Sequence, residues 1–181
     1  MPAARTIAAL VVDDQHSMRA MARLVLKEIG VIDVAVAASA DAAFEQMLGR
    51  RFDVVSSDLN MPGTHGFSAL VHLRGLHPEL PIVMVSAREE AGVIRRALDH
   101  GAMGFIPKSS NAEVLGTALR QVLDGDRWIP DVAVSAPSTP ADEHDIAARV
   151  RELTPQQFRV LQMLGSGKLN KQIGYELGVS E

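Results

Sequence analysis

Five polar side chains follow or end short apolar runs of the sequence, and they are of the types that phosphoryl chemistry uses. Along the chain they are Asp13, Asp14, Asp58, Ser86 and Lys108. Three carboxylates that lie close together repel one another and favour a divalent cation, and Mg²⁺ prefers a few carboxylates, waters and phosphate oxygens. A carboxylate can also attack phosphorus and form an aspartyl phosphate. Mg²⁺ and Lys108 would then neutralise the phosphoryl oxygens, to which the Ser86 hydroxyl would donate a hydrogen bond.

This chemistry requires the apolar runs to be neighbouring strands of one sheet. The runs are rich in Val and Ile and mostly lack alternation, which is typical of strands buried on both faces. They lie at 6–12, 32–37, 52–57, 81–86 and 103–106. Amphipathic helical patterns separate them, so we predict an α/β fold with a five-stranded parallel sheet covered on both faces. Ligands of such sheets bind outside the carboxyl ends of the strands, where the five polar residues stand.

Each of these residues also has a purely structural explanation. Asp13 and Asp14 could cap a helix, Asp58 could precede a turn, Ser86 could cap the next helix, and Lys108 could be a surface lysine. Their common position at strand ends favours the functional interpretation of the whole set.

Composition limits the class of protein. The chain has 181 residues, of which 47% are hydrophobic, so it can bury a core. A net charge of −4 does not favour electrostatic binding of the whole chain to nucleic acid or to a membrane. Without cysteine it forms neither disulfides nor thiolate metal sites. No apolar run approaches the roughly 18 residues of a membrane span, so we expect a cytoplasmic protein with no membrane partner.

Polar residues mark several expected helix starts. Ser110 begins a capping-box pattern before the helix that ends near Gly125, and Thr154 with Gln157 begins another. Asn170 is expected to cap a last short helix. Between residues 126 and 147 the composition turns to Ser, Pro, Ala and acid, which is typical of a linker.

The segments "VVDDQHSMRAM", "FDVVSSDLNMPGTHG", "IVMVSA" and "GAMGFIPKS" resemble the receiver domain of bacterial two-component response regulators. The resemblance covers about residues 5–125 and implies a flavodoxin-like fold with strand order 2-1-3-4-5. It implies that Asp58 is the phosphoacceptor. It also implies a Mg²⁺ site made by the carboxylates of Asp13, Asp14 and Asp58 with the main-chain carbonyl of Asn60. Phosphoryl binding and switching would then involve Ser86, Lys108 and Phe105.

The segment "LTPQQFRVLQMLGSGKLNKQIGYELGVS" resembles the first half of the LuxR-type helix-turn-helix, the output domain of NarL/FixJ regulators. Residues 148–181 would thus be an incomplete all-α output domain, with Lys168, Asn170 and Lys171 on its DNA-binding side. The second helix of such a motif enters the major groove, and the sequence stops where that helix would begin. From residue 149 the excess is only two positive charges, five bases against three acids. Such an excess is small for phosphate contacts.

The resemblance implies a response regulator of a two-component phosphorelay that is phosphorylated on Asp58 by a sensor histidine kinase. Such a protein accepts and loses a phosphoryl group on itself and is not a turnover enzyme, and it could form a homodimer. Duplex DNA would be a partner only if the parent chain continues past Glu181.

Three alternatives remain open. One is a phosphorylation-dependent protein-interaction receiver that does not bind DNA. Another is an aspartyl phosphatase, which often needs a second acid where Asn60 stands. The third is a flavin protein, for which 4% aromatic residues offer little to stack on.

Overall fold

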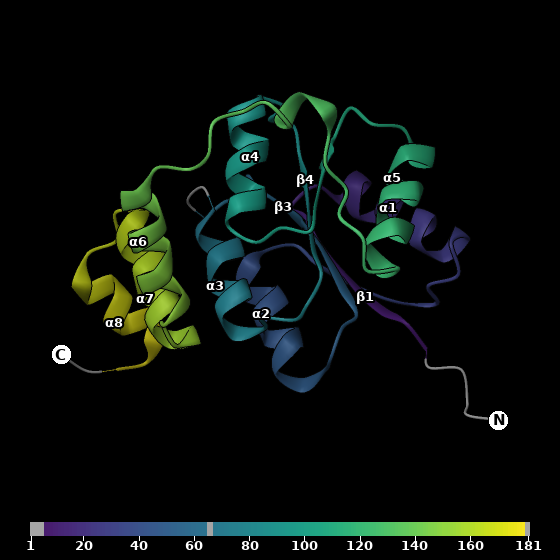
Figure 1. Cartoon of the computed structure of the whole chain (residues 1–181). Coiled ribbons are helices and arrows are strands. Elements are labelled where there is room, and N and C mark those ends of the chain that lie inside the picture. Colours follow the sequence, from purple (N-terminus) through teal and green to yellow (C-terminus); the bar gives the residue numbers. More distant parts are fainter. Residues whose placement is uncertain (1–5, 65–66, 180–181) are drawn as a thin grey trace.

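The computed structural model describes residues 6–64 and 67–179, so the expected domain limits at residues 5 and 181 lie outside the described residues. Five parallel strands form one sheet in the order β2-β1-β3-β4-β5 (Figure 1). The strands are β1 (Ala8–Val12), β2 (Asp33–Ala37), β3 (Val54–Asp58), β4 (Ile82–Ser86) and β5 (Gly104–Pro107). This order confirms the flavodoxin-like sheet that the apolar runs and the resemblance predicted.

Helices cover both faces of the sheet (Figure 1). On one face Val25 and Leu119 pack against buried strand residues, and on the other Leu70 and Ile94 do so. The first face carries α1 (His16–Glu28) and α5 (Ala112–Leu123), and the second carries α2 (Ala40–Gly49), α3 (Ser68–Leu76) and α4 (Ala91–Asp99). Strands β1 and β4 are buried along their whole length, which explains why their sequences do not alternate.

Two of the predicted helix starts are wrong by one residue. Asn111, not Ser110, caps α5, because its side chain accepts a hydrogen bond from the Val114 N–H at 2.9 Å. The last helix, α8 (Asn170–Leu177), includes Asn170, and the preceding Leu169 N–H donates to the Gln172 side chain at 2.9 Å. Ser110 and Asn111 are both able to cap a helix, and only the backbone angles decide between them.

The capping box of α7 (Pro155–Gly165) is confirmed. The Thr154 hydroxyl accepts from the Gln157 N–H at 3.3 Å, and the Gln157 side chain accepts from the Thr154 N–H at 2.9 Å. Two backbone N–H groups at the start of the helix are thereby satisfied.

The range 126–147, expected to be a linker, is partly regular. It contains a short 3-10 helix, η1 (Asp131–Ala133), and the first half of α6 (Ala141–Arg151). Its beginning runs beside β5, where Trp128 accepts from the Phe105 N–H at 3.1 Å and donates to the Met103 carbonyl at 3.0 Å. These bonds cover the edge of the sheet, whose backbone groups would otherwise lack partners.

Helix α6 lies against α3, and α7 and α8 follow beside it (Figure 1). The start of α6 is held to α4 by polar contacts. One Glu143 carboxylate oxygen accepts from Arg96 at 2.8 Å and lies 2.8 Å from Nε2 of the buried His100. Just before α6, the Thr139 N–H and hydroxyl both donate to Asp99 at 2.9 Å. The C-terminal helices are thus packed on the α3–α4 side of the first domain.

No helix among residues 6–64 and 67–179 is both long and apolar enough to cross a membrane.

Candidate functional site

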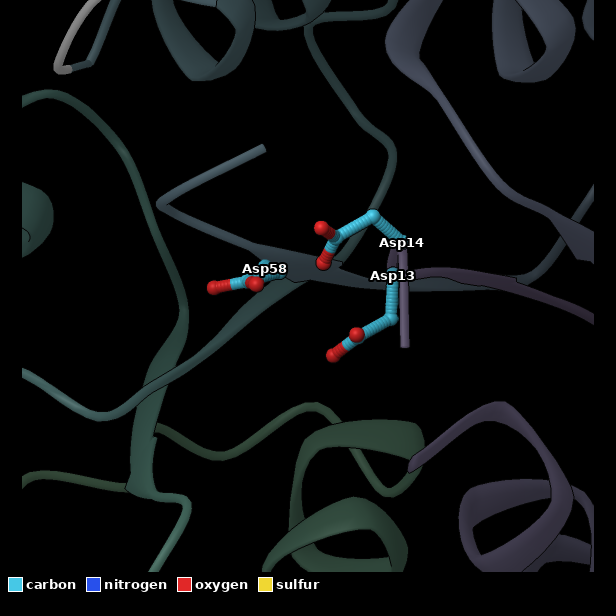
Figure 2. Close-up of side chains that lie close together, drawn as sticks. All are labelled: Asp13, Asp14 and Asp58. Atoms are coloured by element: carbon cyan, nitrogen blue, oxygen red, sulfur yellow. The ribbon is translucent and has the colours of Figure 1, made fainter. Parts of the chain in front are cut away.

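Three carboxylates meet at the carboxyl ends of β1 and β3. These strands pair in parallel, with Val12 beside Ser57, so the residues that follow on β1 arrive next to Asp58. Carboxylate oxygens of Asp13, Asp14 and Asp58 lie within 4.8 Å of one another, and Figure 2 shows the three side chains close together. Hard divalent cations bind such sets of carboxylate oxygens. The sequence-predicted acids are therefore brought together.

Lys108 closes this cluster from the end of β5. Its ammonium is 2.8 Å from Asp13 Oδ2 and 2.8 Å from Asp58 Oδ2. Burial acts to lower the pKa of Lys108, but the hydrogen bonds and negative charges of Asp13 and Asp58 outweigh it and raise that pKa above its usual value. Lys108 therefore stays positively charged beside the carboxylates, where it can offset carboxylate or phosphoryl charge.

The backbone fixes the two buried carboxylates in addition to Lys108. Asp58 Oδ1 accepts from the Asn60 N–H at 3.0 Å, and Asp13 Oδ1 accepts from the Gln15 N–H at 2.8 Å. Asp13 and Asp58 are only 4% and 5% exposed, whereas Asp14 is exposed. Each buried carboxylate thus has both oxygens engaged, and Asp14 faces the solvent.

Ser86 and Lys108 are joined through the backbone of adjacent strands. The Lys108 N–H donates to the Ser86 carbonyl at 2.8 Å. The fully buried Ser86 hydroxyl accepts from the Arg88 N–H at 3.1 Å. Since Asp58 pairs with Val85, Ser86 stands one residue beyond Asp58 on the neighbouring strand.

Phe105 is fully buried in β5 beside Met84 of β4, so its ring points into the core. Phe105 thus lies on one of the two neighbouring strands at whose ends Ser86 and Lys108 stand. Whether the ring acts as a switch stays a prediction.

The predicted DNA-facing residues are on a different part of the chain. Asn170 and Lys171 open α8, and Lys168 lies just before it. The Lys168 ammonium is 2.6 Å from both Glu176 oxygens, so its charge is already paired. These three residues do not join the carboxylate cluster.

Reasoning from sequence missed Arg19 of α1. Its guanidinium Nη1 donates to the carbonyls of Asp13 at 2.5 Å and Asp14 at 2.8 Å. Nothing in the pattern singles out this arginine, because basic residues are common on exposed helix faces. The one signal in the sequence that could have indicated Arg19 is its position about one helical turn after the Asp13–Asp14 pair.

Comparison with known proteins agrees with this geometry. Residues 9–120 match the model of the response regulator receiver domain, and residues 151–181 match the bacterial regulatory proteins of the luxR family. The chain belongs to the response regulators. The receiver match includes every residue of the carboxylate cluster and Lys108.

Two curated proteins of Pseudomonas putida are similar to this response regulator. The glycerol metabolism activator of Pseudomonas putida is 38% identical over 135 residues, which cover 71% of this chain and 61% of that protein. The transcriptional activator protein ExaE of Pseudomonas putida is 30% identical over 174 residues, with coverage of 94% and 81%. The match therefore spans less than two thirds of the first of these relatives.

A solved LuxR family DNA-binding response regulator from Silicibacter pomeroyi is 30% identical to this response regulator. Its TM-score is 0.60, over 69% of this chain and 98% of that one. A DNA-bound RcsB structure covers 97% of this chain and 85% of that chain with a TM-score of 0.65. At 19% identity, that second likeness shows the fold alone.

Proposed function

We propose that this response regulator receives a phosphoryl group on Asp58 from a sensor histidine kinase and thereby switches a transcription-regulating output. The observation that supports it best is the position of Lys108, whose ammonium lies 2.8 Å from both Asp13 and Asp58 in the carboxylate cluster. A carboxylate nucleophile, two further acids and a fixed cation in one place match the needs of phosphoryl transfer.

Asp13, Asp14 and Asp58, with the Asn60 carbonyl, would hold a Mg²⁺ ion. The donor set is all oxygen and carries several negative charges, which fits a hard divalent cation. When bound, the ion supplies positive charge for the phosphoryl oxygens.

In the transfer, an Asp58 carboxylate oxygen attacks phosphorus. A new O–P bond forms as the bond from phosphorus to the leaving group of the donor breaks, and the leaving group keeps that electron pair. Lys108 then moves its hydrogen bond from the carboxylate to a phosphoryl oxygen. The group ends on the protein itself, so the reaction is a self-modification with no external substrate turned over.

The buried Ser86 hydroxyl would report the phosphoryl group. At present it accepts from the Arg88 N–H at 3.1 Å, and as a donor it could turn toward a phosphoryl oxygen. A movement of Ser86 in β4 would displace Phe105 in β5, because the two strands pair residue by residue.

We divide the chain into a receiver at 5–125, a linker at 126–147 and a partial LuxR-type domain at 148–181. In the last part, Lys168 is paired with Glu176, and Arg159 Nη2 is 3.4 Å from Glu45 of α2. Fewer basic side chains are therefore free to contact DNA phosphates than the count of Lys and Arg in the sequence suggests. This 181-residue chain should bind DNA weakly. Duplex DNA would be the partner of a complete LuxR-type output domain, and the response regulator would form a homodimer.

A second candidate function is a phosphorylation-dependent protein-interaction module. The paired cations of the C-terminal helices favour it, because they weaken the electrostatic case for DNA. This alternative would be supported if the chain bound a protein partner and Asp58→Asn abolished that binding. The chain should then also show no salt-sensitive binding to DNA.

Incubation with acetyl phosphate and Mg²⁺ tests the leading proposal. Intact-mass measurement should show one added phosphoryl group in the wild type and in the control Asp41→Asn, an acid on α2 outside the cluster. Asp58→Asn should gain none. An unchanged mass in the wild type, or an equal gain in Asp58→Asn, would contradict the proposal.

A further inference from the structure

We infer that Arg19 is a positioning residue that fixes the direction in which Asp14 presents its carboxylate to a divalent cation. The inference rests on the metal site of the proposed function and adds a residue that does not itself touch the metal. It starts from the two backbone bonds that the Arg19 side chain makes in the turn between β1 and α1.

The bonds of Arg19 go to carbonyls that precede the hydrogen-bond ladder of α1. The ladder begins with the Arg19 N–H and the Gln15 carbonyl, which are 3.1 Å apart. The carbonyls of Asp13 and Asp14 come before it, and Nη1 of Arg19 donates to them at 2.5 Å and 2.8 Å. A side chain therefore satisfies acceptors that the helix backbone does not reach.

These two carbonyls belong to the peptide groups on either side of the Asp14 Cα. Each peptide group is planar, so fixing both planes fixes φ and ψ at Asp14. The Cα–Cβ bond then has one direction, and the carboxylate is aimed from there. Arg19 acts on Asp14 through the backbone and without contact to the carboxylate.

Asp14 depends on this support more than its neighbours do. Asp13 is held directly by Lys108 and the Gln15 N–H, and Asp58 by Lys108 and the Asn60 N–H. Among residues 6–64 and 67–179, no group hydrogen-bonds the exposed Asp14 carboxylate. The one acid without bonds of its own is the one whose flanking peptides Arg19 holds.

Charge and positioning predict opposite effects of removing Arg19. The guanidinium is a cation beside a cation site, so its charge alone disfavours Mg²⁺, and its loss should tighten binding. If Arg19 positions Asp14, its loss should weaken binding, because groups that orient metal ligands change affinity by about 10–100-fold. The sign of the change separates the two effects.

Calorimetric titration of the full chain with MgCl₂, without any phosphoryl donor, provides the test. Arg19→Gln removes the charge and most of the reach of the side chain. Arg23→Gln removes the same charge one turn further along α1, from an exposed residue whose side chain makes no hydrogen bond or ion pair in the described structure. We expect Mg²⁺ affinity to fall on the order of tenfold in Arg19→Gln and to stay equal to the wild type, or rise slightly, in Arg23→Gln.

Arg19→Lys should restore affinity close to that of the wild type, because one nitrogen makes both bonds in the structure and an ammonium can do the same. Circular dichroism shows whether each variant is folded. If Arg19→Gln does not fold, Arg19→Met takes its place, and the contrast of Met with Lys carries the same prediction.

The outcomes separate the two proposals. If the wild type binds Mg²⁺ and Arg19→Gln binds as tightly as Arg23→Gln or more tightly, the role of Arg19 is overturned and the metal site stands. If the wild type does not bind Mg²⁺, the metal site itself is overturned, and this inference with it.

Discussion

His72 of α3 and Phe158 of α7 stack face to face, with ring centroids 4.0 Å apart and 9° between the ring planes. Phe44 of α2 meets both rings edge-on, at 5.2 Å and 5.7 Å. The imidazole is fully buried, and neither of its nitrogens has a regular hydrogen bond within the described structure. This aromatic cluster joins the receiver to the C-terminal helices through a surface that suits a neutral imidazole.

The stability of this contact should fall in mild acid. Burial lowers the pKa of His72, and the nearby Val150 carbonyl opposes the shift. When the helices separate, the pKa returns toward about 6.5. Below about pH 6.5 the separated or unfolded state therefore binds more protons than the folded state. The free energy of unfolding is unaffected by His72 well above about pH 6.5, and it declines as the pH falls from there toward the lowered pKa.

Urea unfolding at about pH 7.5 and about pH 5.5 measures this effect. His72→Phe keeps an aromatic stack but cannot be protonated, so it should lose less stability between the two pH values than the wild type. His16→Gln, at an exposed histidine of α1, should behave as the wild type does. Equal losses in the wild type and His72→Phe would show that His72 does not sense pH.

Gly75 of α3 allows α6 to come close. A Cβ at this position would collide with the backbone of Arg151 at the end of α6. Gly→Ala in a helix usually stabilises a protein by up to about 1 kcal/mol. Here we expect the opposite sign, a loss of about 1–3 kcal/mol as the two helices move apart.

Gly92 of α4 is the matched control, because no atom outside its chain neighbours and its own helix backbone lies within 4 Å of the site a Cβ would occupy. Thermal or urea unfolding should show Gly92→Ala as neutral or stabilising. If Gly75→Ala stabilised the protein as Gly92→Ala does, the close packing of α3 on α6 would be contradicted.

Asp14→Asn should change stability in opposite directions without and with Mg²⁺. Without metal, removing one of three converging charges relieves repulsion and should stabilise the chain by about 0.5–1 kcal/mol. With Mg²⁺, the wild type should gain stability through binding, and the variant should gain much less. Melting curves in EDTA and in MgCl₂ measure both effects. An equal Mg²⁺-induced shift in the two proteins would argue against Asp14 as a ligand.

Much of the fold follows from local sequence patterns. Buried parallel strands need continuous apolar runs, and the run at 81–86 became β4 within one residue. The polar residues after these runs had to meet at one edge of the sheet, so the positions of Asp13, Asp14 and Asp58 in the sequence sufficed to group them. The choice of Ser110 over Asn111 failed because either residue can cap a helix, and backbone angles not visible in sequence decide.

Contacts between segments that are distant in the chain could not be predicted from the sequence. The Phe158 ring stacks on His72 of the receiver, whereas Leu161 of the same helix remains 41% exposed. An amphipathic stripe shows which face of a helix is apolar but does not show what will cover it. The bonds of Arg19 were missed for a similar reason, since they join a side chain to backbone carbonyls that carry no sequence signal.

The central claim is that Asp58 carries the phosphoryl group, and chemical mapping of the modified residue tests it most directly. Borohydride reduces an acyl phosphate of aspartate to homoserine, which marks the residue in a peptide. After treatment with acetyl phosphate and Mg²⁺, we expect homoserine at position 58 alone. Homoserine at Asp13 or Asp14 instead, or no reduced residue in a chain whose mass shows phosphorylation, would contradict it.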